Sequence, residues 1–526
     1  MAERPQYFEN TLTPLSINAT TLSESLQQLR VAVRNGAELI EENTSLPETW
    51  GPNGIFRAFP GIALAFLRLD YQSSVLKDHK AASLDYRCYA LQRIPSSLPD
   101  TPLLASRLSP LGSSSPITAV TLRILATFSK NDWQGGANVS ITREDITCLD
   151  EAMQCALSNE PLVTHDGAKM GGDEVLFGRA GLLWTLLNVR AHNFDQETQG
   201  FLSPVLGAIP ELIRVIVDAG RQGSKEYTEK NGAQDAHPLM YAWMEGHYCF
   251  GAVHGITGIL TILLSCKPEE LTDYIPVIGG TITALCKLSG TTNGHLPRTL
   301  PPYGPKQSSS ELVQLCHGSP GLLILLGAAL KNKSLTRSHW DPSWDQAIYL
   351  GTERVWEEGL LSKGGSLCHG VAGNDAWAWL LLHDCFEYHS ETVNEARVLY
   401  LQDNQLSALP NAEVSQELTS DFFLSRALAF MLHARQTKPY NTSPTSSDKD
   451  YRLPDEPYSL FEGLAGNICA WADTCAVLQA RLRKMELGEQ GVSAISGLSQ
   501  DPVFRDACCR QLGFPSLGGN GAMGIF

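Results

Sequence analysis

The sequence predicts an all-α fold in which helical hairpins are stacked side by side and close into a ring. A short glycine motif, usually Gly-x-x-Gly, recurs along the 526-residue chain, and each copy leads into an apolar run. These runs are rich in Leu and Ala and rarely alternate with polar residues, which favours buried helices over strands. Repetition of a unit that holds one buried helix and one more polar helix is typical of stacked helical hairpins.

The first 50 residues predict a helical segment that leads into the ring. Apolar residues recur there at near-helical spacing, and a threonine before them is a candidate N-cap. The apolar residues are Leu22, Leu26, Leu29 and Val33, and the candidate caps are Thr20 and Thr21.

Six clear glycine steps and one weak step follow, and we expect a buried inner helix after each of them. Glycine at a helix start lets backbones crowd together and adopt positive φ. If the inner helices point their N-terminal ends at one pole of the ring, the residues beside the glycines meet there. The expected inner helices are 61–67, 117–122 (after the weak step near Gly112), 182–187, 259–264, 322–326, 374–380 and 467–471.

We expect a single domain over residues 1–526, although the length alone would allow several. The additions to the ring are the segment 1–50 and an insertion at about 395–455. The second half of this insertion, from Thr437 to Pro457, is polar and predicts a flexible loop.

The overall charge and the cysteine content exclude some classes of protein. The net charge is −16 and no basic stripe is present, which argues against a nucleic-acid-binding protein. The 13 cysteines are odd in number and irregularly spaced, unlike a secreted disulfide framework. We find no signal-like start and no apolar run long enough for a transmembrane segment. We therefore expect a cytoplasmic location, and peripheral attachment to a membrane stays open.

Two Cys-His-Gly steps, at 316–318 and 368–370, predict a zinc site. Zinc prefers thiolate and imidazole ligands, and catalytic sites use three protein ligands and one exchangeable position. Cys368 and His369 can both ligate if the backbone turns sharply, which Gly370 permits, and Cys316 would supply the third ligand. One such pair alone would more often be a buried cysteine beside an unrelated histidine. Two pairs at equivalent helix starts favour the metal site.

Other residues near the glycine steps are candidates for catalysis or substrate binding. His254 lies at an equivalent helix start and could transfer a proton near neutral pH, and His317 is the alternative. Glu174 is a candidate carboxylate at the same pole. Lys363 and Arg452 precede two of the steps and would suit an anionic thiol substrate, although each alone would be an ordinary surface charge.

These motifs resemble the lanthionine synthetase C-like proteins, and specifically their eukaryotic LanC-like branch. The resemblance rests on residues 238–255, 315–321, 363–370 and 458–466. It implies an α/α toroid of seven inner and seven outer helices with one zinc at one end. It also implies that Cys316, Cys368 and His369 are the zinc ligands.

The resemblance further implies an activity. Bacterial members of the family add a thiolate to dehydroalanine or dehydrobutyrine, whereas eukaryotic relatives bind glutathione and are understood to add it to dehydroamino acids in damaged proteins. Lys363 and Arg452 match positions that hold glutathione, and His254 matches the family histidine implicated in proton transfer. His317 stands where the bacterial cyclases have Tyr, which argues against lantibiotic cyclisation.

Three functions follow as hypotheses. The leading one is a zinc-dependent glutathione transferase that forms thioethers on dehydroamino acids in proteins or peptides. The second is a non-catalytic scaffold that binds zinc and glutathione and docks partners such as protein kinases. The third, a glycosidase of similar fold, would require a pair of carboxylates, for which Glu174 and Glu462 are the candidates.

Overall fold

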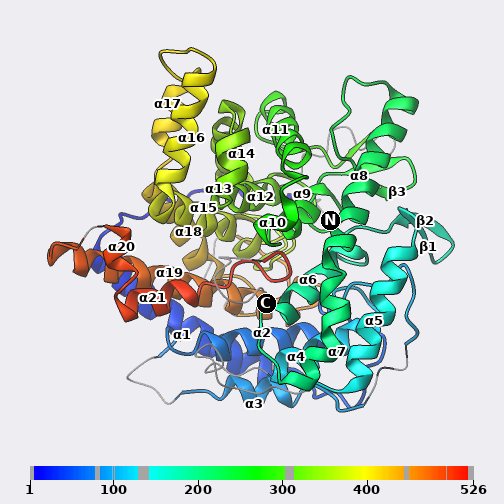
Figure 1. Ribbon diagram of the computed structural model, residues 1–526. Coiled ribbons are helices and arrows are strands. Elements are labelled where there is room, and N and C mark those ends of the chain that lie inside the picture. Colours follow the sequence, from blue (N-terminus) through cyan, green and yellow to red (C-terminus); the bar gives the residue numbers. More distant parts are fainter. Residues whose placement is uncertain are drawn as a thin grey trace.

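The computed structural model is mostly helical and describes residues 5–77, 83–97, 99, 101–127, 141–302, 313–442, 449–492 and 494–518. Seven helices in this part of the chain form a closed series in which each contacts the next and the last contacts the first. Figure 1 shows them around the centre of the view. In order they are α2 (Phe59–Tyr71), α4 (Pro116–Thr127), α6 (Arg179–Arg190), α9 (Ile256–Leu263), α12 (Ser319–Lys331), α15 (Trp377–Tyr388) and α19 (Leu464–Glu489).

These inner helices coincide with the apolar runs of the sequence, so the predicted inner helices are confirmed. They are buried nearly all round; every residue of α9, for example, is buried. The glycine steps lie at their starts, with Gly178, Gly255, Gly318 and Gly463 as the N-cap residues of α6, α9, α12 and α19. A π-helical turn, Ala372–Ala376, leads into α15.

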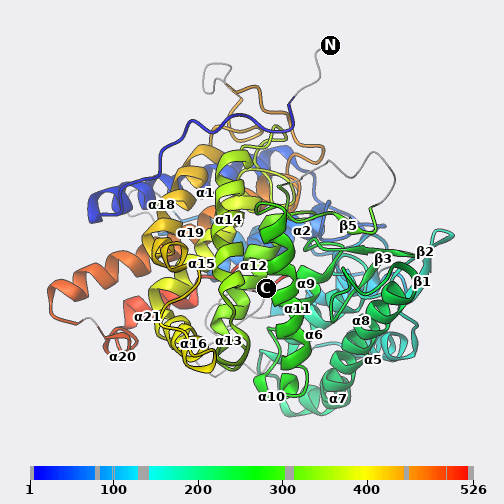
Figure 2. The ribbon, with the colours of Figure 1, turned by 90° about the horizontal axis from the view of Figure 1, so that it is seen from above.

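A second set of helices packs on this inner series, each burying one face. Contacts join α3 to α2, α5 to α4, α8 to α6, α11 and α14 to α12, α18 to α15, and α1 to α19. Their bounds are α1 (Ala19–Asn43), α3 (Tyr86–Leu91), α5 (Arg143–Ser158), α8 (Ile209–Asn231), α11 (Ile275–Thr291), α14 (Pro342–Glu358) and α18 (Ser420–Ala434). Figure 2 shows the same arrangement from above. The remaining helices are α7 (Gln196–Gly207), α10 (Pro268–Leu271), α13 (Lys333–His339), α16 (Ser390–Asp403), α17 (Ala412–Glu417), α20 (Ile495–Leu498) and α21 (Pro502–Cys509).

The structure differs from the sequence-based expectations in its N-terminal cap and in the segment 395–455. Helix α1 is capped by the side chain of Asn18, which accepts a hydrogen bond from the Thr21 N–H at 3.0 Å, so Thr20 and Thr21 are not the cap. The segment 395–455 contains α17 and α18, and α18 packs on α15 as part of the helical layer. Residues 443–448 of the expected flexible loop lie outside the described residues.

A small antiparallel sheet is the main feature that the all-α prediction missed. Its strands follow the order β1 (Leu162–His165), β2 (Ala168–Gly171), β3 (Ala242–Met244), β4 (His247–Cys249) and β5 (Thr299–Leu300). Two tight turns connect its hairpins, one at Asp166-Gly167 and one at Glu245-Gly246, and both contain residues with positive φ. Strands of two to four residues are too short to show a period-2 pattern in the sequence.

Within the described residues, one long segment meets the length and hydropathy criteria for crossing a bilayer. Helices α7 and α8 together cover Gln196–Asn231, with a mean hydropathy of 1.6 over the most apolar window, of which 39% is buried in the structure. Helix α8 packs on α5 and α6, and a core helix meets the same criteria.

Backbone hydrogen bonds join the loops that precede successive inner helices. Six of these bonds lie around one pole, each from a backbone N–H to a carbonyl oxygen of the next loop. The donor and acceptor residues are Phe461 and Phe56, Phe56 and Leu111, Leu108 and Phe177, Ala252 and Leu315, Leu315 and Cys368, and Cys368 and Phe461. The loops approach so closely that a Cβ built on Gly251 would lie 1.6 Å from the carbonyl oxygen of Cys316. Glycine at this step is therefore required by space.

Gly251→Ala should destabilise the fold, because the added methyl group overlaps the Cys316 carbonyl and must push two loops apart. We expect a cost on the order of 2 to 3 kcal/mol in urea-induced unfolding. Gly290→Ala in α11 is the matched control, since a Cβ there has no neighbour within 4 Å. It should be neutral or slightly stabilising. Equal stability of the two variants would contradict the close approach.

Candidate metal centre

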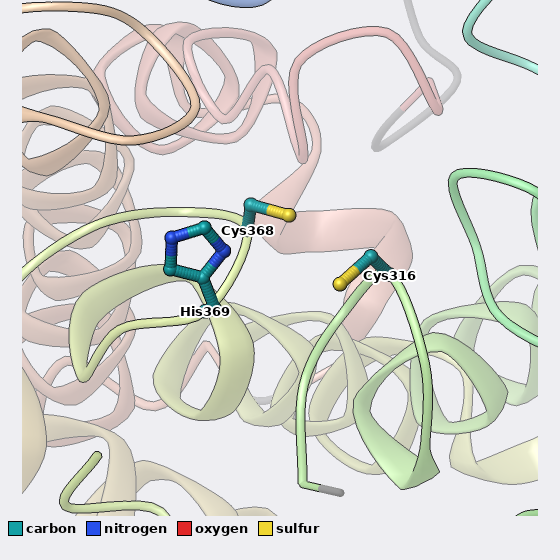
Figure 3. Close-up of side chains that lie close together, drawn as sticks. All are labelled: Cys316, Cys368 and His369. Atoms are coloured by element: carbon teal, nitrogen blue, oxygen red, sulfur yellow. The ribbon is translucent and has the colours of Figure 1, made fainter. Parts of the chain in front are cut away.

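Two cysteines and one histidine converge at the starts of α12 and α15. The ligand atoms of Cys316, Cys368 and His369 all lie within 4.8 Å of one another. Figure 3 shows both sulfur atoms and the imidazole turned toward a common space. The cysteines are buried, with exposed fractions of 8% and 4%, and His369 is half-buried.

The backbone explains why residues 52 positions apart meet. Cys368 stands between two neighbouring loops: its N–H donates to Phe461 O at 2.8 Å, and its carbonyl accepts from Leu315 at 3.2 Å. Gly318, which begins α12, has a φ of 132°, in the region that favours glycine. The chain can therefore turn from Cys316 into the helix while the two loops stay paired.

The electrostatics of the two thiols fit a metal ligand set. A hydrogen bond from Cys368 holds the pKa of Cys316 well below its ordinary value, with a further contribution from His369. The same hydrogen bond, together with burial, raises the pKa of Cys368. The pair thus loses its first proton at Cys316. Two cysteine sulfurs and an imidazole are the donor types that zinc prefers, and a lowered thiol pKa favours the thiolate that a metal binds, so these residues fit the metal.

The three donors open into a cavity of about 450 Å³. One part of its lining is polar and includes His254, His317 and Lys363 besides the donors. Another part is apolar and is formed by Phe56, Leu111, Leu176, Phe177 and Val253. The cavity can therefore hold a polar and an apolar group next to the metal donors.

His254 forms a buried pair with Glu174. The His254 Nδ1 lies 2.8 Å from Glu174 Oε2, and the Glu174 side chain is 2% exposed. Burial alone would lower the pKa of His254, but the charge and hydrogen bond of Glu174 outweigh it, and the pKa is raised. His254 therefore stays protonated to a higher pH than a free histidine, which suits a proton donor.

The pKa of His317 is shifted in the opposite direction to that of His254. Its ring stacks on that of His254 with centroids 5.8 Å apart, and its Nδ1 lies 3.7 Å from Cys249 Sγ. Burial lowers the pKa of His317 to about 4, so it is neutral near pH 7. Of the two histidines proposed from the sequence, only His254 has a raised pKa.

The two basic residues predicted from the sequence, Lys363 and Arg452, differ in their position relative to the cavity. Lys363 lines the cavity. Arg452 is exposed and is not among the lining residues, but its backbone N–H donates to Ser362 O at 2.9 Å, which places it directly beside the Lys363 segment.

The sequence analysis missed two residues at or beside the site, Arg57 and Trp243. Arg57 lines the cavity and forms an ion pair with buried Glu462 at 2.8 Å; its position beside the first glycine step was the available signal. Trp243, on β3, has its ring 5.3 Å from His254 and 5.9 Å from His317. No local pattern marks it. Glu462 and Glu174, the carboxylates of the glycosidase hypothesis, are thus each paired with a basic side chain.

Comparisons with known proteins place the chain in a family. A family profile described as lanthionine synthetase C-like protein matches residues 49–413. The chain is 27% identical to glutathione S-transferase LANCL1 of Danio rerio over 339 residues, which is 64% of this chain and 67% of that protein. It is 27% identical to LanC-like protein GCL1 of Arabidopsis thaliana over 60% of this chain and 58% of that protein, less than two thirds of its length.

Among solved structures, nisin cyclase matches with 14% sequence identity and a TM-score of 0.33, covering 90% of this chain and 97% of that one. Because the family profile matches well over half of the sequence, the chain belongs to the lanthionine synthetase C-like family.

Proposed function

We propose that this protein is a zinc-dependent glutathione transferase that adds the glutathione thiolate to dehydroalanine or dehydrobutyrine residues of proteins or peptides. The observation that carries the proposal is one cavity lined by the donor set Cys316, Cys368 and His369, by the protonatable His254 and by Lys363. The name of the zebrafish relative, a glutathione S-transferase, supports the same reaction class.

Each group has a role in this reaction. Zinc, when bound by Cys316, Cys368 and His369, lowers the pKa of a coordinating thiol and so supplies a thiolate at neutral pH. Lys363 offers a cation to a glutathione carboxylate inside the cavity, and Arg452 offers a second beside it. The apolar part of the lining excludes water from the acceptor.

The reaction forms one carbon–sulfur bond, breaks the carbon–carbon π bond and consumes one proton. The thiolate sulfur forms a bond to the β-carbon of the dehydroamino acid, and the π electrons of the double bond move toward the amide carbonyl. The α-carbon then takes a proton, which His254 delivers. Glu174 holds the His254 ring in place and stabilises its charged form.

The proposal extends to the fold and to the location. We propose that the seven inner helices and the outer set α1, α3, α5, α8, α11, α14 and α18 are the seven inner and seven outer helices of an α/α toroid, supported by the closed series of contacts. Thiol chemistry needs reduced cysteines, so we propose a cytoplasmic location. The acceptors there are proteins that carry dehydroamino acids as damage.

The purified zinc-loaded protein should convert glutathione and a short dehydrobutyrine peptide into a thioether adduct, detected by mass spectrometry. Cys368→Ala should lose both zinc and adduct formation, because one ligand of three is removed. Cys266→Ala is the matched control, since Cys266 is 7% exposed and lies outside the donor set. An adduct formed equally by metal-free protein would overturn the proposal.

His254→Ala should lower kcat by roughly 100-fold or more, the usual effect of removing a general acid. Glutathione binding, measured by calorimetry, should not change, because Lys363 and Arg452 remain. Loss of adduct formation with unchanged glutathione binding in this variant supports the enzyme hypothesis. A wild-type protein that binds glutathione and zinc but yields no adduct would support the scaffold hypothesis.

Glu174→Gln should shift the alkaline limb of the pH–rate profile to lower pH. Glu174 raises the pKa of His254, so the proton donor is present below that raised pKa and is lost as the pH rises through it. Removing the carboxylate charge lowers the pKa of His254 and moves this loss to lower pH. An unchanged alkaline limb would show that His254 does not supply the proton.

A further inference from the structure

The N-terminal strap, residues 5–18, crosses the molecule in extended form before α1 begins. Figure 2 shows it as the dark blue segment that passes over the top of the view toward α1. It reaches α18, where Leu15 N–H donates to Ser425 O at 3.2 Å. None of the functional candidates from the sequence lies in the strap.

The strap pairs with the segment that carries Lys363. Phe8 N–H donates to Leu360 O at 2.8 Å, Ser362 N–H donates to Gln6 O at 3.1 Å, and Tyr7 lies opposite Leu361 in an antiparallel bridge. Backbone pairing fixes the position of a segment along its whole length. The residue immediately before Lys363 is thus held by the strap.

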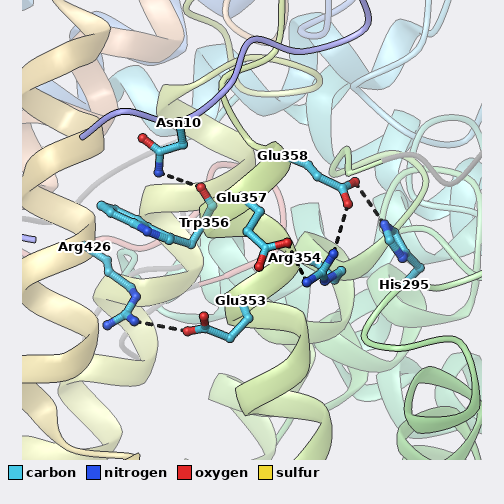
Figure 4. Close-up of polar contacts among 8 residues, drawn as sticks. All are labelled: Asn10, His295, Glu353, Arg354, Trp356, Glu357, Glu358 and Arg426. Atoms are coloured by element: carbon cyan, nitrogen blue, oxygen red, sulfur yellow. Dashed lines mark hydrogen bonds and ion pairs between the residues drawn. The ribbon is translucent and has the colours of Figure 1, made fainter. Parts of the chain in front are cut away.

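A side-chain hydrogen bond ties the strap to the end of α14. The Asn10 amide donates to the carbonyl of Trp356 at 2.6 Å, and the Asn10 oxygen accepts from Leu12 N–H at 2.9 Å. The last carbonyls of a helix have no partner within the helix, so Asn10 caps α14 from a distant part of the chain. Figure 4 shows the Asn10 amide turned toward this carbonyl.

The last turns of α14 are held on two sides by an ion pair and a histidine–carboxylate contact. Arg426 contacts Glu353 at 3.1 Å, and His295 contacts Glu358 at 3.0 Å (Figure 4). The strap therefore docks on a fixed helix end, from which the chain passes directly to Lys363.

The strap also contacts the segment that carries Arg452. The Phe8 ring meets that of Tyr451 edge-on with centroids 5.1 Å apart, and the buried Tyr451 hydroxyl lies 2.8 Å from His433 Nε2. Arg452 N–H donates to Ser362 O at 2.9 Å. Three backbone segments, from the strap, from 360–362 and from 451–452, are thus joined through Ser362.

We propose that Phe8 and Asn10 are positioning residues for the thiol substrate: the strap sets where Lys363 and Arg452 stand relative to the metal donors. The inference rests on the proposed function, in which these two cations hold glutathione carboxylates. Lysine and arginine have long, flexible side chains, so the position of their charge depends on a fixed backbone. Two cations that come from segments 89 residues apart need such a common support.

Phe8→Ala and Asn10→Ala should each raise the KM and the calorimetric Kd for glutathione roughly 10-fold, as expected when hydrogen bonds to a charged group are misplaced. The KM for the acceptor peptide, kcat and zinc content should stay unchanged, because the strap pairs with residues 360–362 and the metal donors stand outside that segment. A general loss of folding would not produce this selective change. Phe8→Tyr keeps the ring and should restore the wild-type KM.

Asn43→Ala is the matched control, because the Asn43 amide also donates to a carbonyl near a helix end, Leu39 O at 2.8 Å, within α1. It should leave the glutathione KM unchanged. Lys363→Ala is the positive reference. If Lys363→Ala raises the KM and both strap variants do not, the strap inference fails alone. If Lys363→Ala has no effect, or the zinc-loaded wild type binds no glutathione, the assignment of the thiol site fails first.

Discussion

The hydrogen-bonded approach of the loops before the inner helices is the constraint on which the rest of the structure depends. Each loop donates or accepts through its backbone, and glycine stands where one backbone approaches another most closely. Gly251 beside the Cys316 carbonyl shows how little space remains. Because the backbone itself forms the contact, the positions of the residues between the glycines are set with little freedom.

The same loop pairing brings the residues of the candidate metal centre together. Cys316 and Cys368 stand on paired loops, and their thiols share a hydrogen bond that makes one of them acidic. Burial alone would lower the pKa of both His254 and His317, but the Glu174 carboxylate reverses this effect at His254. His254 has a carboxylate partner that raises its pKa, whereas burial lowers the pKa of His317 to about 4 and leaves it neutral near pH 7. One pole of the fold thus holds an acidic thiol, a histidine with a raised pKa and a neutral imidazole around a single cavity.

The sequence predicted the features that repeat or that use rare residue types. The glycine steps marked every inner helix, and the Cys-His-Gly pairs marked the donor set, because local spacing carries both signals. It could not predict features that arise from distant contacts. Trp243 lies on a three-residue strand that is too short to show a period. Arg57 is placed at the site by its ion pair with Glu462, which is distant in the sequence. The cap of α1 at Asn18 shows a further limit, since several neighbouring polar residues could each fill that position.

The closure of the helix series by α19 has a consequence for biosynthesis. Helix α19 contacts both α1 and α2, and the loop before it supplies Phe461, the backbone partner of Cys368. A ribosome releases the N-terminal helices long before these residues emerge. The nascent chain therefore holds Cys368 without this backbone partner until Phe461 has emerged from the ribosome. The complete backbone pairing of the candidate metal ligands thus has to follow the synthesis of the loop before α19.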